Sequence, residues 1–196
     1  MARIYYDELR AALSSNIFDT LTTESNESQR EMESIDTFNN AGRKELTGEN
    51  YDHFREQLAK MKEALSNRAN LATNLNNSIR EALTLLINYM ESYQFLDSSR
   101  LEEYNTYRTN CINGINYLNT LLHQQNRTDY NIIYQNIETV KNTLSELDKI
   151  IAKVEGLDSV YQQAQQILTE AFYGIDYFNS RVSDIKPDGL YTYSIS

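Results

Sequence analysis

The sequence predicts an all-α protein built as an elongated bundle of long antiparallel helices. Its 196 residues include only 6 Gly and 1 Pro, so little of the chain favours turns or helix breaks. Between Tyr51 and Tyr93, apolar and aromatic residues recur alternately three and four positions apart, which keeps them on one face of a helix. At 1.5 Å per residue this helix would be roughly 65 Å long, too long for a compact globule. We therefore expect other helices to lie along it.

The same periodicity predicts a first helix over residues 4–38. Its polar middle, residues 22–30, is expected to contact its neighbours less than the two ends do, or to leave room for a partner side chain. Residues 39–50 hold two Gly and several Asn, which suit the turn of a helical hairpin. The central helix is expected to follow an N-cap at Asn50 and to end near Leu96, antiparallel to the first.

A third helix is expected over residues 100–124, behind a capping box formed by Ser99 and Glu102. A fourth helix is expected after a cap at Asp129. At Gly156 the alternation of three and four slips, and the sequence leaves open whether the helix kinks, breaks or continues there.

We expect one elongated helical domain over residues 1–183. Pro187 and Gly189 disfavour further helix, so residues 184–196 are expected to form an extended or disordered tail. Arg68 and Arg108 stand on otherwise apolar seams. Their stems are expected to pack while their charged heads reach water, near acidic side chains of adjacent helices.

Charge and composition narrow the possible partners. The formal net charge of −10 predicts repulsion from nucleic acid and from anionic membranes. No apolar run approaches the roughly 20 residues of a membrane-spanning helix. Asp7 and Glu8 stand where a signal peptide would carry its apolar core. A single Cys excludes a disulfide within the chain and is compatible with a reducing cytoplasm.

No combination of residues in the sequence points to catalysis or to a cofactor. A di-iron bundle needs Glu-x-x-His pairs, but Asn50 and Thr120 stand three positions before the two His residues. Zinc would need more Cys and His than the chain has. Cys111 lies on a helix seam and is expected to be a buried structural thiol. We therefore expect no enzyme, no metal and no cofactor.

The turn after the first helix carries Leu46-Thr47-Gly48, followed by the aromatic Tyr51. Leu46 is suited to fill the open end of a helical hairpin, and Gly48 permits a backbone conformation that a Cβ disfavours. This run resembles the Leu-X-Gly (LXG) family, the N-terminal domains of polymorphic toxins exported by the type VII secretion system of Gram-positive bacteria. The hairpin is similar to that of the small WXG-type secretion substrates, with Leu in place of Trp. Residues 87–98 carry a weaker similarity to the same family.

The resemblance implies a non-enzymatic targeting domain that binds small helical WXG-like partner proteins and is accepted by the secretion ATPase. It also implies a protein that is cytoplasmic before export and then secreted or held at the cell surface, without a cleaved signal peptide. The family normally carries a toxin domain after its helical region, so residues 184–196 would begin the connection to one. The alternative class is a self-associating coiled-coil structural or scaffold protein.

Tyrosine is abundant, with 15 residues, and it suits protein interfaces because it combines a large area with a polar tip. We expect partner helices to bind the first helix together with the Tyr-rich part of the last one. The candidate partner-binding residues are Tyr5, Tyr6, Leu9, Leu13, Ile17, Leu21, Tyr173 and Tyr177.

Type VII substrates resemble one another in a Tyr-x-x-x-Asp/Glu export signal near a helix end. Three pairs fit or approach this pattern: Tyr93 with Asp97, Tyr134 with Glu138, and Phe172 with Asp176. With 15 Tyr and 28 acidic residues in the chain, composition alone predicts roughly 2 matches. The pattern is therefore a weak signal, and the resemblance implies that helical partners can supply the signal instead.

Overall fold

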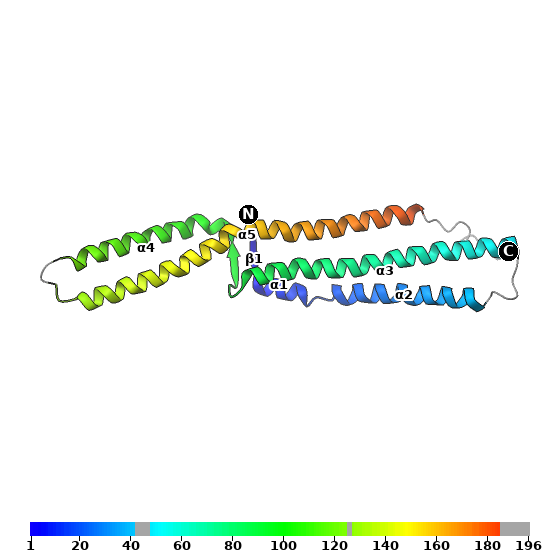
Figure 1. Cartoon of the computed structure of the whole chain (residues 1–196), viewed down its shortest axis with the longest axis horizontal. Coiled ribbons are helices and arrows are strands. Elements are labelled where there is room, and N and C mark those ends of the chain that lie inside the picture. Colours follow the sequence, from blue (N-terminus) through cyan, green and yellow to red (C-terminus); the bar gives the residue numbers. More distant parts are fainter. Residues whose placement is uncertain (42–47, 125–126, 185–196) are drawn as a thin grey trace. The chain divides into compact units, whose positions relative to one another are not determined.

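The computed structural model describes residues 1–41, 48–124 and 127–184, with side chains as far as Asp176. The chain is an all-α helical bundle, as predicted, with one small sheet (Figure 1). The elements of the described residues are β1 (Arg3–Tyr5), α1 (Tyr6–Leu13), α2 (Ile17–Ala41), α3 (Glu49–Met90), β2 (Phe95–Asp97), the 3₁₀ turn η2 (Ser98–Arg100), α4 (Leu101–Leu122) and α5 (Tyr130–Asp184). Of the predicted tail, only Asp184 lies within these residues, and there it ends α5.

The contacts of the chain group into two compact units, which are described separately. Unit 1 contains Met1–Ala11 and Leu85–Gln163, and unit 2 contains Ala12–Thr84 and the chain from Ala164 onward. The helices α1, α3 and α5 contribute residues to both units. The single domain expected over residues 1–183, and its elongated shape, stay predictions.

In unit 2 the helices α2 and α3 run antiparallel (Figure 1). Lys62 of α3 binds Asp36 near the end of α2, with Nζ 2.6 Å from Oδ1. Further along, Arg68 forms an ion pair with Glu24. The pair that lies later in α3 lies earlier in α2, as antiparallel helices require. The two ion pairs therefore define the register between α2 and α3. The prediction that the charged head of Arg68 meets an acidic neighbour is confirmed.

The polar middle of α2, residues 22–30, contains one buried side chain. Ser28 is completely buried and shares a face of α2 with buried Met32 and Ile35. On α3, the small side chains of Ala69 and Ala72 are buried as well. Small residues at a helix contact let the two backbones approach closely. Ser28 is thus packed, although most of residues 22–30 are exposed, and the expectation that this stretch has fewer contacts or accepts a partner side chain stays a prediction.

The prediction of one helix over residues 4–38 is wrong. The chain instead forms β1, then α1, and begins α2 only at Ile17, after the bend at residues 14–16. Ser and Asn side chains compete with helical hydrogen bonds, which explains the interruption at Ser14-Ser15-Asn16. The carbonyl of Asn16 then accepts both the N–H and the hydroxyl of Thr20, 3.0 Å each, and so starts α2.

Unit 1 contains the sheet. The strands β1 and β2 pair antiparallel, and Ile4 lies opposite Leu96. Both side chains are buried in a core cluster completed by Ala2, Met90, Val154 and Leu157. The central helix therefore ends at Met90, not near Leu96 as expected. Glu91 adopts a positive φ of 51° there, which turns the chain toward β2.

The hairpin of α4 and α5 completes unit 1. Arg108 of α4 binds Asp148 of α5, with Nε 2.6 Å from Oδ1, in agreement with the prediction of an acidic neighbour. The capping box is wrong, because α4 begins at Leu101 behind η2 and Arg100 makes no side-chain cap. The helix α5 continues without a break through Gly156.

Candidate functional site

Gly48 is the one residue of the predicted family motif within the described part of the chain, because Leu46 and Thr47 lie outside it. Its φ is +131°, a conformation that residues with a Cβ rarely adopt, so the predicted need for Gly at this position is confirmed. Its carbonyl oxygen accepts the N–H groups of Tyr51 and Asp52, 3.0 Å each. Gly48 is therefore the N-cap of α3, and the prediction of Asn50 as the cap is wrong.

Aromatic side chains gather at the same end of the α2–α3 hairpin. The rings of Phe38 and Phe54 meet edge to face, with centroids 5.7 Å apart. The guanidinium of Arg55 lies 5.9 Å from the ring centroid of Tyr51. Phe38 remains exposed although its ring packs on Phe54, so this end of the hairpin presents an aromatic side chain to solvent.

The predicted partner-binding residues of the N-terminal region do not form one continuous face. The ring of Tyr5 packs on Phe95 across the sheet, with centroids 4.7 Å apart. Tyr6 and Leu9 pack against the core cluster of unit 1. Leu13, Ile17 and Leu21 belong to unit 2, where Leu13 and Leu21 are half-buried and Ile17 is 47% exposed.

On α5 the predicted residues of unit 2 are accessible. Phe172, Tyr173 and Asp176 are all exposed, although Tyr173 was predicted as a partner contact and the other two as an export signal. The side chain of Tyr177 lies outside the described residues. Consecutive exposed aromatic residues on a surface helix are typical of a contact surface.

The export-signal patterns of unit 1 lie in two different environments. Tyr134 and Glu138 are exposed one turn apart on α5, and the Glu138 carboxylate accepts a hydrogen bond from Lys141 at 3.1 Å. Tyr93 packs against the core cluster and Asp97 is buried. Of these two pairs, only Tyr134 with Glu138 is therefore accessible to a receptor.

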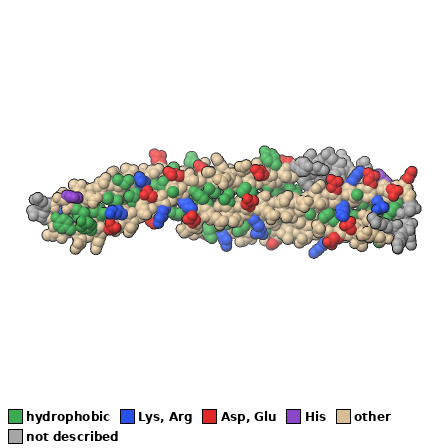
Figure 2. All heavy atoms as spheres, viewed as in Figure 1, with side chains coloured by type: hydrophobic (Ala, Val, Ile, Leu, Met, Phe, Trp, Pro, Cys, Tyr) green, Lys and Arg blue, Asp and Glu red, His purple; other side chains and the backbone are tan. Residues whose placement is uncertain are grey.

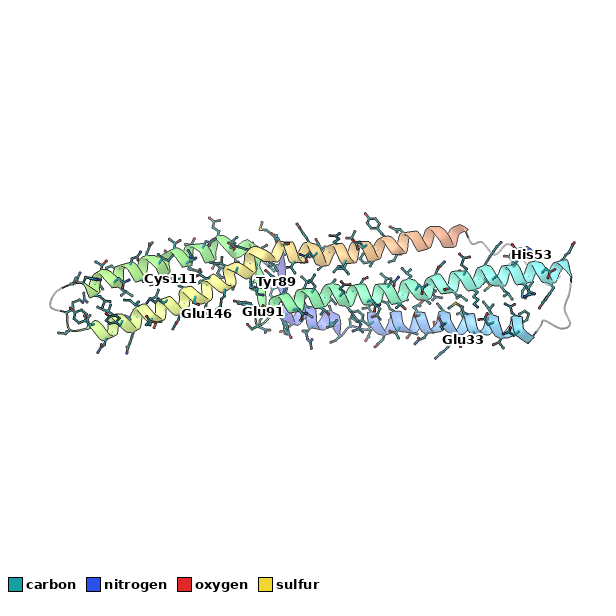
Figure 3. The ribbon with its side chains drawn as sticks, in the orientation of Figure 1. Glu33, His53, Tyr89, Glu91, Cys111 and Glu146 are labelled. Carbon is teal, nitrogen blue, oxygen red and sulfur yellow. The ribbon has the colours of Figure 1, made fainter. Side chains whose placement is uncertain are left out.

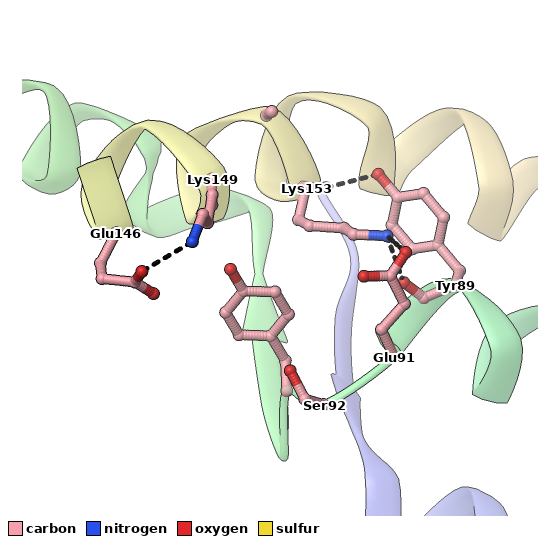
Figure 4. A pocket seen from close by; sticks show the side chains of 8 residues that line it. Tyr89, Glu91, Ser92, Glu146, Lys149 and Lys153 are labelled. Carbon is pink, nitrogen blue, oxygen red and sulfur yellow. Dashed lines mark hydrogen bonds and ion pairs between the residues drawn. The ribbon is translucent and has the colours of Figure 1, made fainter.

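A polar cavity of about 550 Å³ lies in unit 1, beside the end of α3 (Figure 4). The Nζ of Lys153 donates to the carbonyl of Tyr89 at 2.9 Å and to the carboxylate of Glu91 at 2.8 Å. In return, the hydroxyl of Tyr89 donates to the carbonyl of Lys153 at 2.6 Å. Burial raises the pKa of the Tyr89 hydroxyl, and the nearby ammonium of Lys153 opposes that shift. The remaining lining residues are Ser92, Tyr93, Glu146, Lys149 and Ala152.

This arrangement caps a helix. The last carbonyls of an α-helix have no partner within it and favour a cation, which Lys153 supplies to the end of α3. The second ammonium of the cavity, that of Lys149, is paired with Glu146 at 2.8 Å. Each lysine thus has a carboxylate partner, and the cluster fastens α3 to α5 within unit 1.

Gly156 makes that contact possible. A Cβ built on Gly156 would lie 2.4 Å from the hydroxyl oxygen of Tyr89. This is far below van der Waals contact, so the absence of a side chain here lets Tyr89 reach the backbone of α5. Of the alternatives left open at Gly156, a break is excluded, because α5 is one continuous helix through this residue.

A second polar network fixes the N-terminal strand. The carboxylate of Asp158 accepts the N–H of Ala2 at 2.7 Å and the hydroxyl of Ser98 at 2.9 Å. The hydrogen bond from Ser98 is the main reason why the pKa of Asp158 lies below its ordinary value. Three segments distant in sequence are thereby joined at one carboxylate.

The neighbouring Asp97 is buried at the end of β2. Its carboxylate accepts the hydroxyl of Ser99 at 2.6 Å, the Ser99 N–H at 2.9 Å and the guanidinium of Arg3 at 2.9 Å. The hydroxyl of Ser99 is the main cause that lowers the pKa of Asp97, and burial works against it. Asp97 is therefore the N-cap of η2, through the hydrogen bond that its carboxylate accepts from the Ser99 N–H.

Within residues 1–41, 48–124 and 127–184, no group of three or more His, Cys, Asp or Glu residues is placed to hold a metal ion. None of the described helices combines the length and apolarity needed to cross a membrane. Cys111, expected to be buried, is half-buried. Figure 3 shows its position on α4.

The chain was also compared with known proteins. No protein-family model, no curated protein and no solved structure matches it. The resemblance of the turn residues to the LXG family therefore stays a prediction from the sequence.

Proposed function

We propose that this chain is a non-enzymatic targeting and protein-interaction module, similar to the N-terminal domain of an LXG toxin. It binds small helical partner proteins, and the complex is accepted by the ATPase of a type VII secretion system. The observation that supports this proposal most directly is Gly48. It starts α3 at a positive φ, in the turn of an antiparallel hairpin and directly after Leu46 and Thr47.

The exposed apolar side chains of unit 2 supply a surface for such partners. Ile17 stands at the start of α2, with half-buried Leu21 one turn further on. Phe172 and Tyr173 are exposed on α5. A partner helix recognises anchors spaced three or four residues apart, and exposed aromatic groups are its usual contacts. On this proposal, unit 2 carries the partner-binding residues.

The proposed route follows from the same resemblance. The protein is held in the cytoplasm with its helical partners and is exported without a cleaved signal peptide, to be secreted or retained at the cell surface. Tyr134 with Glu138 on α5, or a partner protein, supplies the export signal.

Co-expression with the short helical proteins encoded beside this gene tests the proposal. A stoichiometric hetero-complex, weighed by light scattering, is expected. Ile17→Asp places a charge at an exposed apolar anchor and is expected to weaken the complex by roughly 10-fold or more. The matched control is Thr23→Asp, which adds the same charge at an exposed polar position of α2 on another face.

Two results would overturn the proposal. One is the absence of any complex with the wild-type chain. The other is a homo-oligomer that Ile17→Asp dissociates, because the exposed residues of unit 2 would then bind a second copy, as in the self-associating scaffold. Equal weakening by Ile17→Asp and Thr23→Asp would remove α2 from the partner-binding surface.

A further inference from the structure

The α4–α5 hairpin of unit 1 has an open apolar groove along one side. No residue of α4 is buried, although the helix is 22 residues long. A groove of about 420 Å³ lies between the two helices and is lined by Tyr107, Asn110, Cys111, Gly114, Val140, Thr143 and Leu147. Figure 3 shows Cys111 on α4. Pairing the two helices therefore leaves part of their apolar surface uncovered.

No side chain that lines this groove is charged. Residues 109–137 contain a single cation, Arg127, and a single anion, Asp129. These two bind each other through paired contacts of 2.9 Å, so the segment carries no net charge. The whole chain has a formal net charge of −10, which makes this end of the hairpin electrically unlike the rest. In Figure 2, hydrophobic side chains gather toward the left-hand end, where α4 meets α5.

The face of α4 along the groove is symmetric in its spacing about Gly114. Tyr117 and Cys111 stand three residues to either side of Gly114, and Leu121 and Tyr107 stand seven residues to either side. Positions three and seven apart share one face of a helix. Tyr107 is 49% exposed and Tyr117 is 64% exposed. A Cβ built on Gly114 meets no atom within 4 Å, so the centre of this face is open space.

We infer that the hairpin self-associates through this groove, with the α4 helices of two copies crossing antiparallel at Gly114. In a two-fold contact the same patch of both copies forms the interface. A residue a given number of positions before Gly114 in one copy therefore meets the residue the same number of positions after Gly114 in the other. Tyr117 of each copy then covers Cys111 of the other, and Tyr107 meets Leu121. Gly114 lets the two backbones approach closely at the crossing.

Charge favours a second copy as the occupant. Two chains of net charge −10 repel each other, and an uncharged face is where they meet without that cost. A different protein would be selected by charges complementary to those of the groove, and its lining offers none. This inference does not rest on the proposed function, because the proposed partner-binding residues belong to unit 2 and the groove belongs to unit 1.

Sedimentation equilibrium over a wide range of protein concentrations tests the inference. The wild-type chain is expected to form a reversible dimer. Gly114→Glu fills the crossing point and buries a charge there, so dimerisation is expected to weaken by roughly 10-fold or more. The monomer keeps its fold, because the new Cβ meets open space and Glu favours helix over Gly. Asn116→Glu adds the same charge on another face of α4 and is expected to leave the dimer intact.

Chemical labelling locates the contact. Alkylation of Cys111 is expected to slow as the concentration rises through the dimer midpoint. In a Cys111→Ser background and with an added oxidant such as diamide, Gly114→Cys is expected to form a disulfide between copies, since the two residues meet at the crossing. Three results would overturn the inference: a wild-type chain that stays monomeric, equal weakening by Gly114→Glu and Asn116→Glu, or an alkylation rate independent of concentration. The inference would likewise be overturned if Gly114→Glu weakened the binding of another helical protein and left dimerisation unchanged.

Discussion

Replacing Gly156 with Ala tests the contact that fastens α3 to α5 in unit 1. In an exposed helix interior the change from Gly to Ala is favourable, by about 1 kcal/mol. Here the added Cβ would stand 2.4 Å from the hydroxyl oxygen of Tyr89. The ring must therefore move, and its hydrogen bond of 2.6 Å to the carbonyl of Lys153 is lost.

The magnitude follows from three contributions. Loss of the hydrogen bond costs about 1 kcal/mol, because Tyr89 is only half-buried and water replaces part of it. Forcing a methyl group into a packed contact costs about 1–3 kcal/mol. The helix propensity of Ala returns about 1 kcal/mol. Gly156→Ala is thus expected to destabilise the protein by about 1–3 kcal/mol.

A double-mutant cycle isolates the cause. In Tyr89→Phe the hydroxyl is absent, and the nearest ring atom lies 3.4 Å from the Cβ position, an ordinary contact. In that background Gly156→Ala is expected to be neutral or to stabilise by up to about 1 kcal/mol. The coupling free energy between the two positions is therefore about 1–4 kcal/mol.

Urea unfolding followed by circular dichroism measures each corner of the cycle, compared at equal m-value. The matched control is Gly114→Ala, where the new Cβ meets no atom within 4 Å, so stabilisation by about 1 kcal/mol is expected at concentrations below the dimer midpoint. If Gly156→Ala stabilised the wild type as much as it stabilises Tyr89→Phe, the ring would be free to swing aside and the reasoning would be refuted.

Three further predictions concern other parts of the chain. Gly48→Val, with or without Leu46→Asp, is expected to cost about 1–3 kcal/mol at its positive φ and to raise hydrogen exchange at the start of α3; an even rise along the whole chain would contradict this. Asp97→Asn is expected to cost about 1–2 kcal/mol at neutral pH. Because the folded pKa of Asp97 is lowered, its contribution is present above about pH 4 and is lost as the pH falls through the folded pKa. Thermal unfolding of both forms should therefore converge in acid, and a constant difference would be inconsistent with the shift. Lys62→Ala is expected to cost less than about 1 kcal/mol in urea unfolding, since its ion pair is half exposed, and a larger loss would mean that the pair is effectively shielded from water.

The sequence predicted the helices well because their signal is local. Alternation of three and four marks a helix face wherever one side of a long segment is buried, and the interior of α3 follows it from Tyr51 onward. The charged interruptions on the seams were also predictable. A long Arg side chain packs its stem and extends its head, so Arg68 meets Glu24 and Arg108 meets Asp148.

The sheet was not predictable in this way. Ile4 and Leu96 suit a helix seam as well as a strand, and only their pairing with each other makes them a sheet. Periodicity carries no information about contacts between such distant segments. The end of α3 at Glu91 was not predictable either, since a positive φ is uncommon for a residue with a side chain. The side chain of Asp97 caps η2 directly after β2, and this cap, too, depends on where the strand ends.

The slip of the apolar pattern at Gly156 has a physical explanation that the sequence alone left open. Before Gly156, the seam of α5 faces α4, as Val140 and Leu147 do at the groove. Around it, Val154 and Leu157 turn into the core cluster of unit 1 with Ile4, Leu96 and the end of α3. In unit 2, Gly174 of the same helix lies 3.8 Å from Leu71 of α3, measured from its Cβ position. A helix that exchanges one neighbour for another must rotate its apolar stripe. Two successive steps of three residues, from Ile151 to Val154 to Leu157, produce this rotation within one continuous helix. The slip therefore marks a change of packing partner along one continuous helix, and Gly156 stands at that change because the ring of Tyr89 occupies the space of its side chain.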